Sequence, residues 1–227
     1  DSTYMLPGTN IKMDIDLKYN IDQENIYAMG GAIKVDLEPV AVKGMSTTNS
    51  IDIWNEFYKT ETKIVNGKSI KMTQNEIKIQ KDKATKRLNN GNYNVPVEAK
   101  SSINIATNIF DGQNGINKKT LTKLLSDIGQ IESEYDEKIQ IGGGPARSYW
   151  QIEPATALDT LKQNEKSDNP IFGQKFEKQF ASFIKNKSDT TVLKYLSKLS
   201  KNEMQKLLLN NSDLAATIAL GIVLNRQ

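Results

Sequence analysis

The residues able to do chemistry in this chain are limited by two absences. The sequence contains no cysteine and no histidine, which excludes disulfides, cysteine or histidine nucleophiles, Ser-His-Asp triads and most zinc sites. Catalysis must therefore rest on carboxylates, lysine, tyrosine, serine or threonine. One stretch, residues 131–154, combines an early glutamate, a glycine run, one of only three arginines and a Tyr-Trp pair. Its candidate site residues are Glu132, Ser133, Arg147, Tyr149 and Gln151.

A helix is predicted over residues 118–136, immediately around the glutamate. At about 100° per residue, one arc of about 120° collects the apolar side chains. These are Leu121, Leu124, Leu125, Ile128, Ile131 and Tyr135. The opposite face carries Lys119, Lys123, Gln130, Glu134 and Glu137. The pattern therefore predicts one buried face and one solvated face.

Glu132 falls inside the apolar arc and is the candidate for acid-base chemistry. Loss of hydration favours the protonated form of a carboxyl group unless a cation lies beside it, and a protonated carboxyl group suits a general acid. The alternative is that Glu132 reaches out at the edge of the apolar stripe or caps a neighbouring helix. The helix pattern alone leaves both interpretations open.

A turn is predicted after this helix. Residues 142–145, three glycines and a proline, end any helix and allow a sharp reversal, so residues 146–151 are predicted to return toward its end. A phosphate-binding loop is not favoured, because no Gly-Lys-Ser/Thr follows the glycines and no apolar strand precedes them. Trp150 is predicted to pack in the core, whereas Tyr149 and Gln151 have polar ends suited to sugar hydroxyls and amides.

The elements that must position these residues change character near residue 100. Before it, apolar and polar residues alternate, which predicts strands, and Asn66-Gly67 is typical of a type I′ hairpin turn. The predicted strand segments are 11–19, 32–42 and 63–72, with a turn-rich linker candidate at 89–96. After residue 100 the periodicity is helical. Helices are expected near 118–136, 154–164, 171–185, 190–198, 201–210 and 212–225. The predicted fold class is α+β, with a β-rich module at residues 1–100 and an all-helical domain at residues 101–227.

Charge and hydropathy narrow the choice of partners. The 30 basic and 27 acidic residues give a net charge of only +3, too small and too evenly spread to predict a nucleic-acid-specific site. The longest apolar run, residues 214–224, is shorter than the roughly 18 to 20 residues of a membrane span, so no membrane span is expected in this chain. The first ten residues lack the basic and apolar regions of a signal peptide. No pattern indicates a cofactor or a metal site.

Two stretches resemble a known superfamily. Residues 128–133 read Ile-Gly-Gln-Ile-Glu-Ser, and residues 144–157 read Gly-Pro-Ala-Arg-Ser-Tyr-Trp-Gln-Ile-Glu-Pro-Ala-Thr-Ala. They are similar to the lysozyme-like superfamily, above all to lytic transglycosylase and phage lysozyme domains. In those domains a helix ends in Glu-Ser, and a loop of the form Gly-x-Ala-Arg-x-x-x-Gln-x-x-Pro-x-Thr-Ala follows. The run Ala-Arg-Ser-Tyr-Trp-Gln is closest to peptidoglycan-degrading domains of phage virion proteins. The resemblance covers about residues 115–227 and does not extend to residues 1–100.

The resemblance implies a role for each candidate residue. Glu132 would be the general acid that protonates the glycosidic oxygen between N-acetylmuramic acid and N-acetylglucosamine, and Ser133 would orient the reacting sugar or the carboxyl group. Gln151 would border the substrate groove, and Tyr149 would lie in the same loop. Arg147 would hold the loop to the helix body or contact the carboxylates of the stem peptide. The resemblance implies no cofactor and no metal.

The resemblance also implies how many carboxylates the reaction uses. Most glycosidases need two, whereas a lytic transglycosylase uses one glutamate as acid and then as base while the muramic C6 hydroxyl closes a 1,6-anhydro ring. Asp136 lies one helical turn beyond Glu132 and Glu134 faces elsewhere, so neither is an obvious nucleophile. Glu153 precedes Pro154 as a charge at a helix start. A peptidoglycan lytic transglycosylase is therefore favoured over a hydrolysing muramidase.

One departure from the family keeps other hypotheses open. The Tyr-Asn-Ala-Gly stretch of many lytic transglycosylases has no counterpart after Trp150, which fits either a shorter phage-type variant or a chain that ends before the domain does. The alternatives are a structural virion protein with a vestigial lysozyme-like domain and a wall-binding module that holds glycan without cleaving it. The expected setting is a phage particle, as a tail or internal virion component that acts in the host periplasm or cell wall during genome entry. The expected partners are bacterial peptidoglycan glycan strands and, through residues 1–100, other virion or tail proteins.

Overall fold

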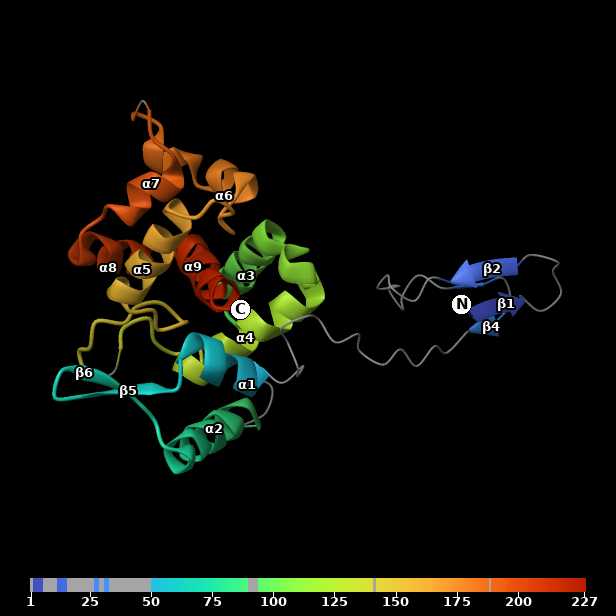
Figure 1. The fold of residues 1–227 in the computed structure, drawn as a ribbon, viewed down its shortest axis with the longest axis horizontal. Helices are drawn as coiled ribbons and strands as arrows, with labels where there is room; N and C mark the ends of the chain where they lie inside the picture. The colour runs from blue at the N-terminus through green and yellow to red at the C-terminus, as the bar shows by residue number, and fades with distance from the viewer. Residues whose placement is uncertain are drawn as a thin grey trace. The chain divides into compact units, whose positions relative to one another are not determined.

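The chain divides into two compact units, Asp1–Ala41 and Val42–Gln227, whose ribbons are drawn in Figure 1. The structure is a computed structural model. It describes residues 2–5, 12–15, 27–28, 31–32, 50–89, 94–140, 142–187 and 189–227. All of the candidate site residues lie in the second unit.

The first unit contains two short antiparallel strand pairs. The strands are β1 (Ser2–Met5) with β2 (Lys12–Ile15), and β3 (Tyr27–Ala28) with β4 (Gly31–Ala32). The strand predicted at residues 11–19 is confirmed over its described part, Lys12–Ile15. The strand predicted at residues 32–42 lies outside the described residues after its first position.

Residues 50–89 pack into the helical unit and do not belong to a separate β-rich module. They form α1 (Ser50–Ile53), the π-helical turn η2 (Trp54–Tyr58), the hairpin of β5 (Thr62–Val65) and β6 (Lys68–Lys71), and α2 (Gln74–Asn89). The compact units therefore divide after Ala41 and not near residue 100. The physical reason is that Ile53, Trp54, Tyr58 and Ala84 are buried in the same core as the helices that follow.

The hairpin agrees with its sequence signal, but α2 does not follow from apolar periodicity. Asn66 (φ 51°) and Gly67 (φ 75°) both have positive φ, as a type I′ turn requires, and Val65 pairs with Lys68. Along the 16 residues of α2 only Ile77 and Ala84 are buried. A helix with so narrow an apolar face gives little periodic signal.

The remaining helices follow the predicted segments closely, except α3 and η3, which no predicted segment covers. They are α3 (Val97–Phe110), η3 (Gln113–Gly115), α4 (Lys118–Ser133), α5 (Pro154–Glu165), α6 (Gln174–Gln179), η4 (Ala181–Ile184), α7 (Val192–Ser197), α8 (Lys201–Asn210) and α9 (Ser212–Asn225). The helix predicted at residues 171–185 is split in two, because the chain leaves helical geometry at Phe180. The linker candidate at residues 89–96 falls partly outside the described residues.

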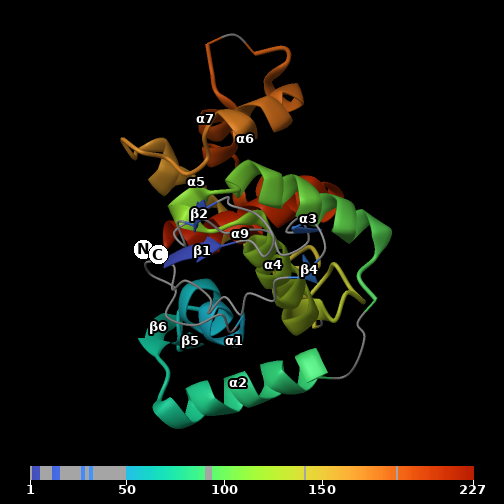
Figure 2. The ribbon, with the colours of Figure 1, turned by 90° about the vertical axis from the view of Figure 1, so that its right-hand side faces the viewer.

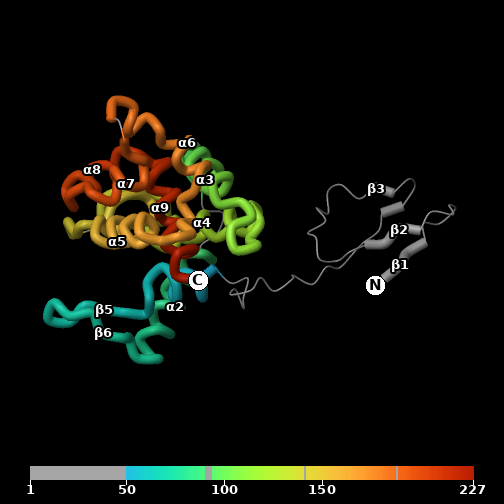
Figure 3. The backbone as a smooth tube through the Cα atoms, turned by 45° about the horizontal axis from the view of Figure 1, so that its top comes forward, coloured from blue at the N-terminus to red at the C-terminus, as the bar shows by residue number. Residues whose placement is uncertain are grey.

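The core is centred on α9, which is buried along most of its length and packs against α3, α4, α5, α8 and η2. Gly221 lets the ring of Phe172 approach the backbone of α9, where a Cβ atom would collide with it. In Figures 1 and 2, α2 lies at the end of this unit away from α6 and α7, on the far side of α4. Figure 3 shows the β5–β6 hairpin extending outward from the same end.

The architecture is a mixed α+β chain dominated by helices, with the strands confined to short antiparallel pairs. In the described ranges, no helix taken singly has the length and apolar character needed to cross a membrane. α8 and α9 pass that test only as a pair, joined at a bend of 113°.

Candidate active site

Glu132 lies in the last turn of α4. The six apolar side chains predicted to share one arc are all buried. Five of them lie on α4 and confirm the predicted face, whereas Tyr135 follows the end of the helix at Ser133. The predicted polar face differs at Gln130, which is buried because α2 packs against it, and its Nε2 donates to the Arg87 carbonyl at 3.0 Å. The Glu132 side chain is 7% exposed, so its carboxyl group is almost removed from bulk water.

α4 ends at Ser133 because the chain then turns into left-handed geometry. Glu134 (φ 53°) and Tyr135 (φ 60°) both have positive φ, a conformation that costs a residue other than glycine about 1–2 kcal/mol. Tyr135 folds its ring over Gly129, where a Cβ atom would collide with it, and its hydroxyl donates to the Ser126 carbonyl at 2.8 Å. This reversal holds the last turn of α4, and with it the carboxyl group, in place.

The Glu132 carboxyl group is contacted from a distant part of the chain, residues 54–63, called here the segment wall. Trp54 Nε1 donates to Oε1 at 2.7 Å. Lys59 Nζ lies 2.8 Å from Oε1 and donates to Oε2 at 3.0 Å. Trp54 is buried, whereas the Lys59 side chain is 36% exposed. The carboxyl group is therefore held by one ion pair and one indole hydrogen bond.

The loop after α4, residues 134–153, returns to the helix as predicted and is called here the loop wall. Arg147 forms isolated antiparallel bridges with Ile139 and Ile152, so the loop closes on itself. Trp150 is fully buried, and its indole Nε1 donates to a backbone carbonyl of α4 at 3.0 Å. The core position predicted for this tryptophan is confirmed.

Arg147 fastens the loop wall internally. Its guanidinium Nη1 donates to the carbonyls of Gly144 at 2.6 Å and Ala146 at 2.8 Å. The side chain therefore ties the loop to its own backbone. The resemblance implies a tie to the helix body instead. Arg147 is also not among the described residues that line the cavity beside Glu132.

Gln151 and Ser133 line that cavity. Gln151 has a positive φ of 45°, and its Nε2 donates to the carbonyls of Ser148 at 2.9 Å and Glu137 at 3.3 Å. The Ser133 hydroxyl donates to the Gly129 carbonyl at 3.2 Å. Both side chains are therefore held by backbone carbonyls. The hydrogen-bonding positions that these contacts do not use lie at the cavity surface.

Tyr149 is a packing residue and not a cavity residue. Its ring centroid lies 5.6 Å from that of Tyr135 and 6.2 Å from that of Trp150. The Lys138 ammonium group sits 4.9 Å from the Tyr149 centroid, at cation–π distance. The expected sugar contact is replaced by aromatic packing, because the turn at residues 148–151 directs this ring toward the end of α4.

Tyr58 joins the two walls. Its hydroxyl donates to the Trp150 carbonyl at 2.5 Å. Burial raises the pKa of Tyr58 well above its ordinary value, and the negative charge of Glu132 adds to this effect. Arg226 Nη1 donates to the carbonyls of Phe57 at 2.9 Å and Tyr58 at 3.1 Å, and burial lowers the pKa of its guanidinium. The segment wall is thus held from both the loop and the end of α9.

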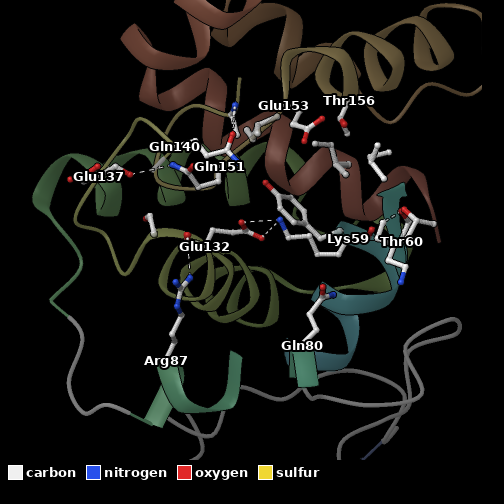
Figure 4. A pocket seen from close by; sticks show the side chains of 18 of the residues that line it. Lys59, Thr60, Gln80, Arg87, Glu132, Glu137, Gln140, Gln151, Glu153 and Thr156 are labelled. Atoms are coloured by element: carbon white, nitrogen blue, oxygen red, sulfur yellow. Dashed lines mark hydrogen bonds and ion pairs between the residues drawn. The ribbon is translucent and has the colours of Figure 1, made fainter. Parts of the chain in front are cut away.

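The two walls, α2 and α4 surround a cavity of about 820 Å³. Polar side chains dominate its lining, among them Lys59, Glu132, Ser133, Gln140, Gln151 and Glu153. In Figure 4, Glu132 and Lys59 point toward each other, while Gln140 and Gln151 lie together on one side. The volume is within the range of about 300–1,000 Å³ typical of ligand sites.

Backbone strain concentrates around this cavity. Nine residues other than glycine have positive φ in the described ranges, and six of them lie in the two walls. These six are Thr60, Glu61, Glu134, Tyr135, Ser148 and Gln151. Such conformations cost about 1–3 kcal/mol each and cluster at functional sites, so their distribution supports a functional role for the cavity.

Further carboxylates border the same cavity. Asp136, Glu137 and Glu153 line it with exposed side chains, whereas Glu134 lies 3.3 Å from the guanidinium of Arg87. Glu153 is the N-cap residue of α5, in keeping with its predicted place at a helix start. Within the described ranges, no group of three or more acidic residues is arranged to hold a metal ion.

Trp54 and Lys59 are site residues that the sequence does not predict. Their signal is the apolar spacing of Ile53, Trp54, Phe57 and Tyr58, which fits one face of a helix. That spacing does not indicate a partner 73 to 78 residues further along the chain. Comparison of the chain with protein-family models, with curated proteins and with solved structures found no match in any of the three.

Proposed function

We propose that this chain is a peptidoglycan lytic transglycosylase whose second unit is a lysozyme-like domain. The observation that carries the proposal is the position of Glu132, a nearly buried carboxyl group at the end of α4 on the wall of a polar cavity of about 820 Å³. A general acid needs an environment that lets it hold and deliver a proton near neutral pH, and burial contributes to that. The Glu-Ser and Ala-Arg-Ser-Tyr-Trp-Gln stretches around it supply the resemblance to wall-degrading enzymes.

In this proposal Glu132 acts twice. It first donates its proton to the glycosidic oxygen, and the bond between that oxygen and C1 of N-acetylmuramic acid breaks. The resulting carboxylate then accepts the proton of the muramic C6 hydroxyl while the C6 oxygen bonds to C1. The products are a chain ending in 1,6-anhydro-muramic acid and a chain with a free 4-hydroxyl on N-acetylglucosamine. Glu132 ends protonated, and no water is consumed.

The side chains around Glu132 have the chemistry to bind a glycan. Gln140 and Gln151 present amides to the cavity, and Ser133 presents a hydroxyl. These groups donate to and accept from sugar hydroxyls and N-acetyl groups. Ser133 follows the acid directly, at a position from which it can orient the reacting sugar.

A hydrolysing muramidase is the second candidate, and a specific observation favours it. Asp136 and Glu153 line the same cavity as Glu132 with exposed side chains. A second carboxylate at about 5–5.5 Å from the acid would suit a retaining hydrolase, and one at about 6.5–9.5 Å an inverting one. The transglycosylase is preferred because Glu132 is the nearly buried carboxylate of the set.

The first test is the variant Glu132→Gln on purified bacterial cell walls. The amide conserves volume but carries no transferable proton, so wall clearing is expected to fall by at least about 100-fold. Circular dichroism and thermal melting of the variant serve as the control for folding. Substantial clearing by the variant would remove Glu132 from the mechanism. Wild-type protein that stays on walls without clearing them would support the wall-binding or vestigial alternative.

The product decides between the two enzymatic candidates. Mass spectrometry of digested peptidoglycan is expected to show muropeptides ending in 1,6-anhydro-muramic acid, lighter by one water than hydrolytic products. Reducing ends throughout the digest would favour the muramidase, with Asp136→Asn and Glu153→Gln as the next variants.

The same resemblance suggests where the enzyme works. The proposed setting is a phage particle, as a tail or internal virion component that opens the host wall during genome entry. Its substrate would be the glycan strands of peptidoglycan, and its other partners would be virion or tail proteins. Detection of the chain in purified particles by mass spectrometry checks this part of the proposal.

A further inference from the structure

We infer that Trp54 and Lys59 are the positioning residues of Glu132, and that Lys59 sets the pH above which Glu132 ceases to supply a proton. This inference rests on the proposed function for its enzymatic consequence. Its physical part, the coupling of Lys59 to the ionisation of Glu132, is measurable without any activity.

The geometry gives the two residues different tasks. Trp54 is a buried, rigid donor whose indole N–H holds Oε1 at 2.7 Å. Lys59 reaches both carboxyl oxygens, at 2.8 and 3.0 Å, from a side chain that is 36% exposed. Trp54 therefore fixes the direction of the carboxyl group, while Lys59 is the contact that can leave when a substrate enters.

Among the described residues, Lys59 supplies the charged group that contacts the Glu132 carboxyl group. From the same π-helical turn, Tyr58 faces the site as a neutral hydroxyl bound to the Trp150 carbonyl. Arg87 of α2 reaches the backbone carbonyl of Glu132 at 3.4 Å and not its carboxyl group. The other charged groups around the cavity are Lys63, Glu134, Asp136, Glu137, Glu153 and Arg226.

This arrangement has a consequence for the reaction. The proton must reside on Glu132 when the glycosidic oxygen arrives, yet the ammonium group of Lys59 stabilises the ionised form. A glycan that enters the cavity must therefore displace Lys59 from the carboxyl oxygens, or meet them at a pH low enough for protonation. Removing the ammonium group extends the protonated form to higher pH, because the carboxyl group stays buried without its cation.

The chain contains a built-in reporter of this ionisation. It has two tryptophans, and both indoles are hydrogen-bonded: Trp54 to the Glu132 carboxyl group at 2.7 Å and Trp150 to the Leu125 carbonyl at 3.0 Å. In a ¹⁵N–¹H NMR titration, the Trp54 indole signal is expected to shift as Glu132 changes ionisation. The Trp150 signal is the internal control, because a backbone carbonyl does not titrate.

The test compares four proteins by this titration. Lys59→Met is expected to move the midpoint of the Trp54 titration to higher pH, because the opposite charge beside the carboxyl group is removed. Lys59→Arg keeps a cation and is expected to restore the wild-type midpoint. Lys63→Met is the matched control, because Lys63 lines the same cavity but its ammonium group is engaged by Glu76. It is expected to leave the midpoint unchanged.

The outcomes separate the inference from the proposed function. A Lys59→Met midpoint equal to or below that of the wild type overturns the inference, as does a shift of the same size in Lys63→Met. For wall degradation, the upper pH limit of kcat/KM is expected to rise by the same amount in Lys59→Met. If the NMR shift is observed but the protein degrades no wall, the ion-pair coupling is supported and the proposed function is contradicted. If Lys59→Met degrades walls but its upper pH limit is unchanged, the proposed function is supported and the inference is contradicted.

Discussion

The loop wall and the segment wall meet at the same carboxylate but are built in different ways. The loop wall begins two residues after Glu132 and closes through paired backbone hydrogen bonds between Arg147 and Ile152, at 3.0 and 2.9 Å. The segment wall comes from much earlier in the chain. It contacts the carboxyl group through the side chains of Trp54 and Lys59, which lie 78 and 73 residues before Glu132. One wall gives the cavity its shape, and the other gives the carboxylate its charge environment.

This difference predicts where pH can act. The backbone hydrogen bonds between Arg147 and Ile152 contain no titrating group, so this closure of the loop wall does not depend directly on pH. The segment wall depends on ionisable side chains at several points, namely Tyr58, Lys59 and the Lys63–Glu76 pair. A change of pH should therefore loosen the contacts of the segment wall before it affects the Arg147–Ile152 closure of the loop wall.

The largest effect is expected from Trp150→Ala in the loop wall. The indole is fully buried and donates to the Leu125 carbonyl, so truncation leaves a cavity and an unpaired acceptor. The free energy of unfolding is expected to fall by about 3–5 kcal/mol, measured by urea denaturation. Tyr149→Ala is the neighbouring control and should cost less, because that ring is only half-buried. Equal losses in the two variants would contradict the assignment of Trp150 as the core of this wall.

A smaller effect is expected from Tyr58→Phe, which removes the link between the walls. The Trp150 carbonyl loses its buried donor, and the free energy of unfolding is expected to fall by about 1–3 kcal/mol. Because burial raises the pKa of Tyr58, the hydroxyl's contribution is fully present below the ordinary tyrosine value of about 10 and is lost as pH rises above it. The difference between wild type and variant, measured by denaturation from pH 8 to 11, should therefore shrink above pH 10. A constant difference would exclude a neutral buried Tyr58.

The smallest effect concerns Glu76 of α2, which pairs with Lys63 at the end of the segment wall. Its pKa is lowered to about 2, first by the hydrogen bond from Lys63 and then by those from Thr73. The stabilisation is therefore present above the ordinary pKa of about 4.5 and is lost as pH falls toward 2. The amide signals at the start of α2 are expected to shift over this range, whereas that of Arg147 should not. Glu76→Gln should abolish the shift, and a matching shift in the loop wall would show that the whole unit is unfolding.

The parts of the site that could be predicted are those encoded within a short stretch of sequence. The apolar arc of α4, the return of the loop after residues 142–145 and the core position of Trp150 all depend on contacts between near neighbours in the chain. Tyr149 and Arg147 also lie in this stretch, but their side-chain directions depend on the left-handed turns at residues 148–151, which sequence periodicity does not encode.

The parts that could not be predicted depend on contacts between distant segments. Gln130 lies on the polar side of α4 by angle, yet it is buried because α2 covers it. α2 itself has too narrow an apolar face to be recognised. Lys59 is one of many lysines in the sequence, and only the fold distinguishes it by placing it against Glu132.

Arg226 makes the cavity depend on the order in which the chain is synthesised. It holds the carbonyls of Phe57 and Tyr58 from 169 and 168 residues further along. At typical synthesis rates Glu132 is made on the order of ten seconds before Arg226. During that interval the segment wall lacks the two hydrogen bonds from Arg226, because α9 has yet to be added to the core. The geometry around Glu132 is therefore completed only when α9 packs, because the backbone that carries Tyr58 and leads into Lys59 gains its last hydrogen bonds from Arg226.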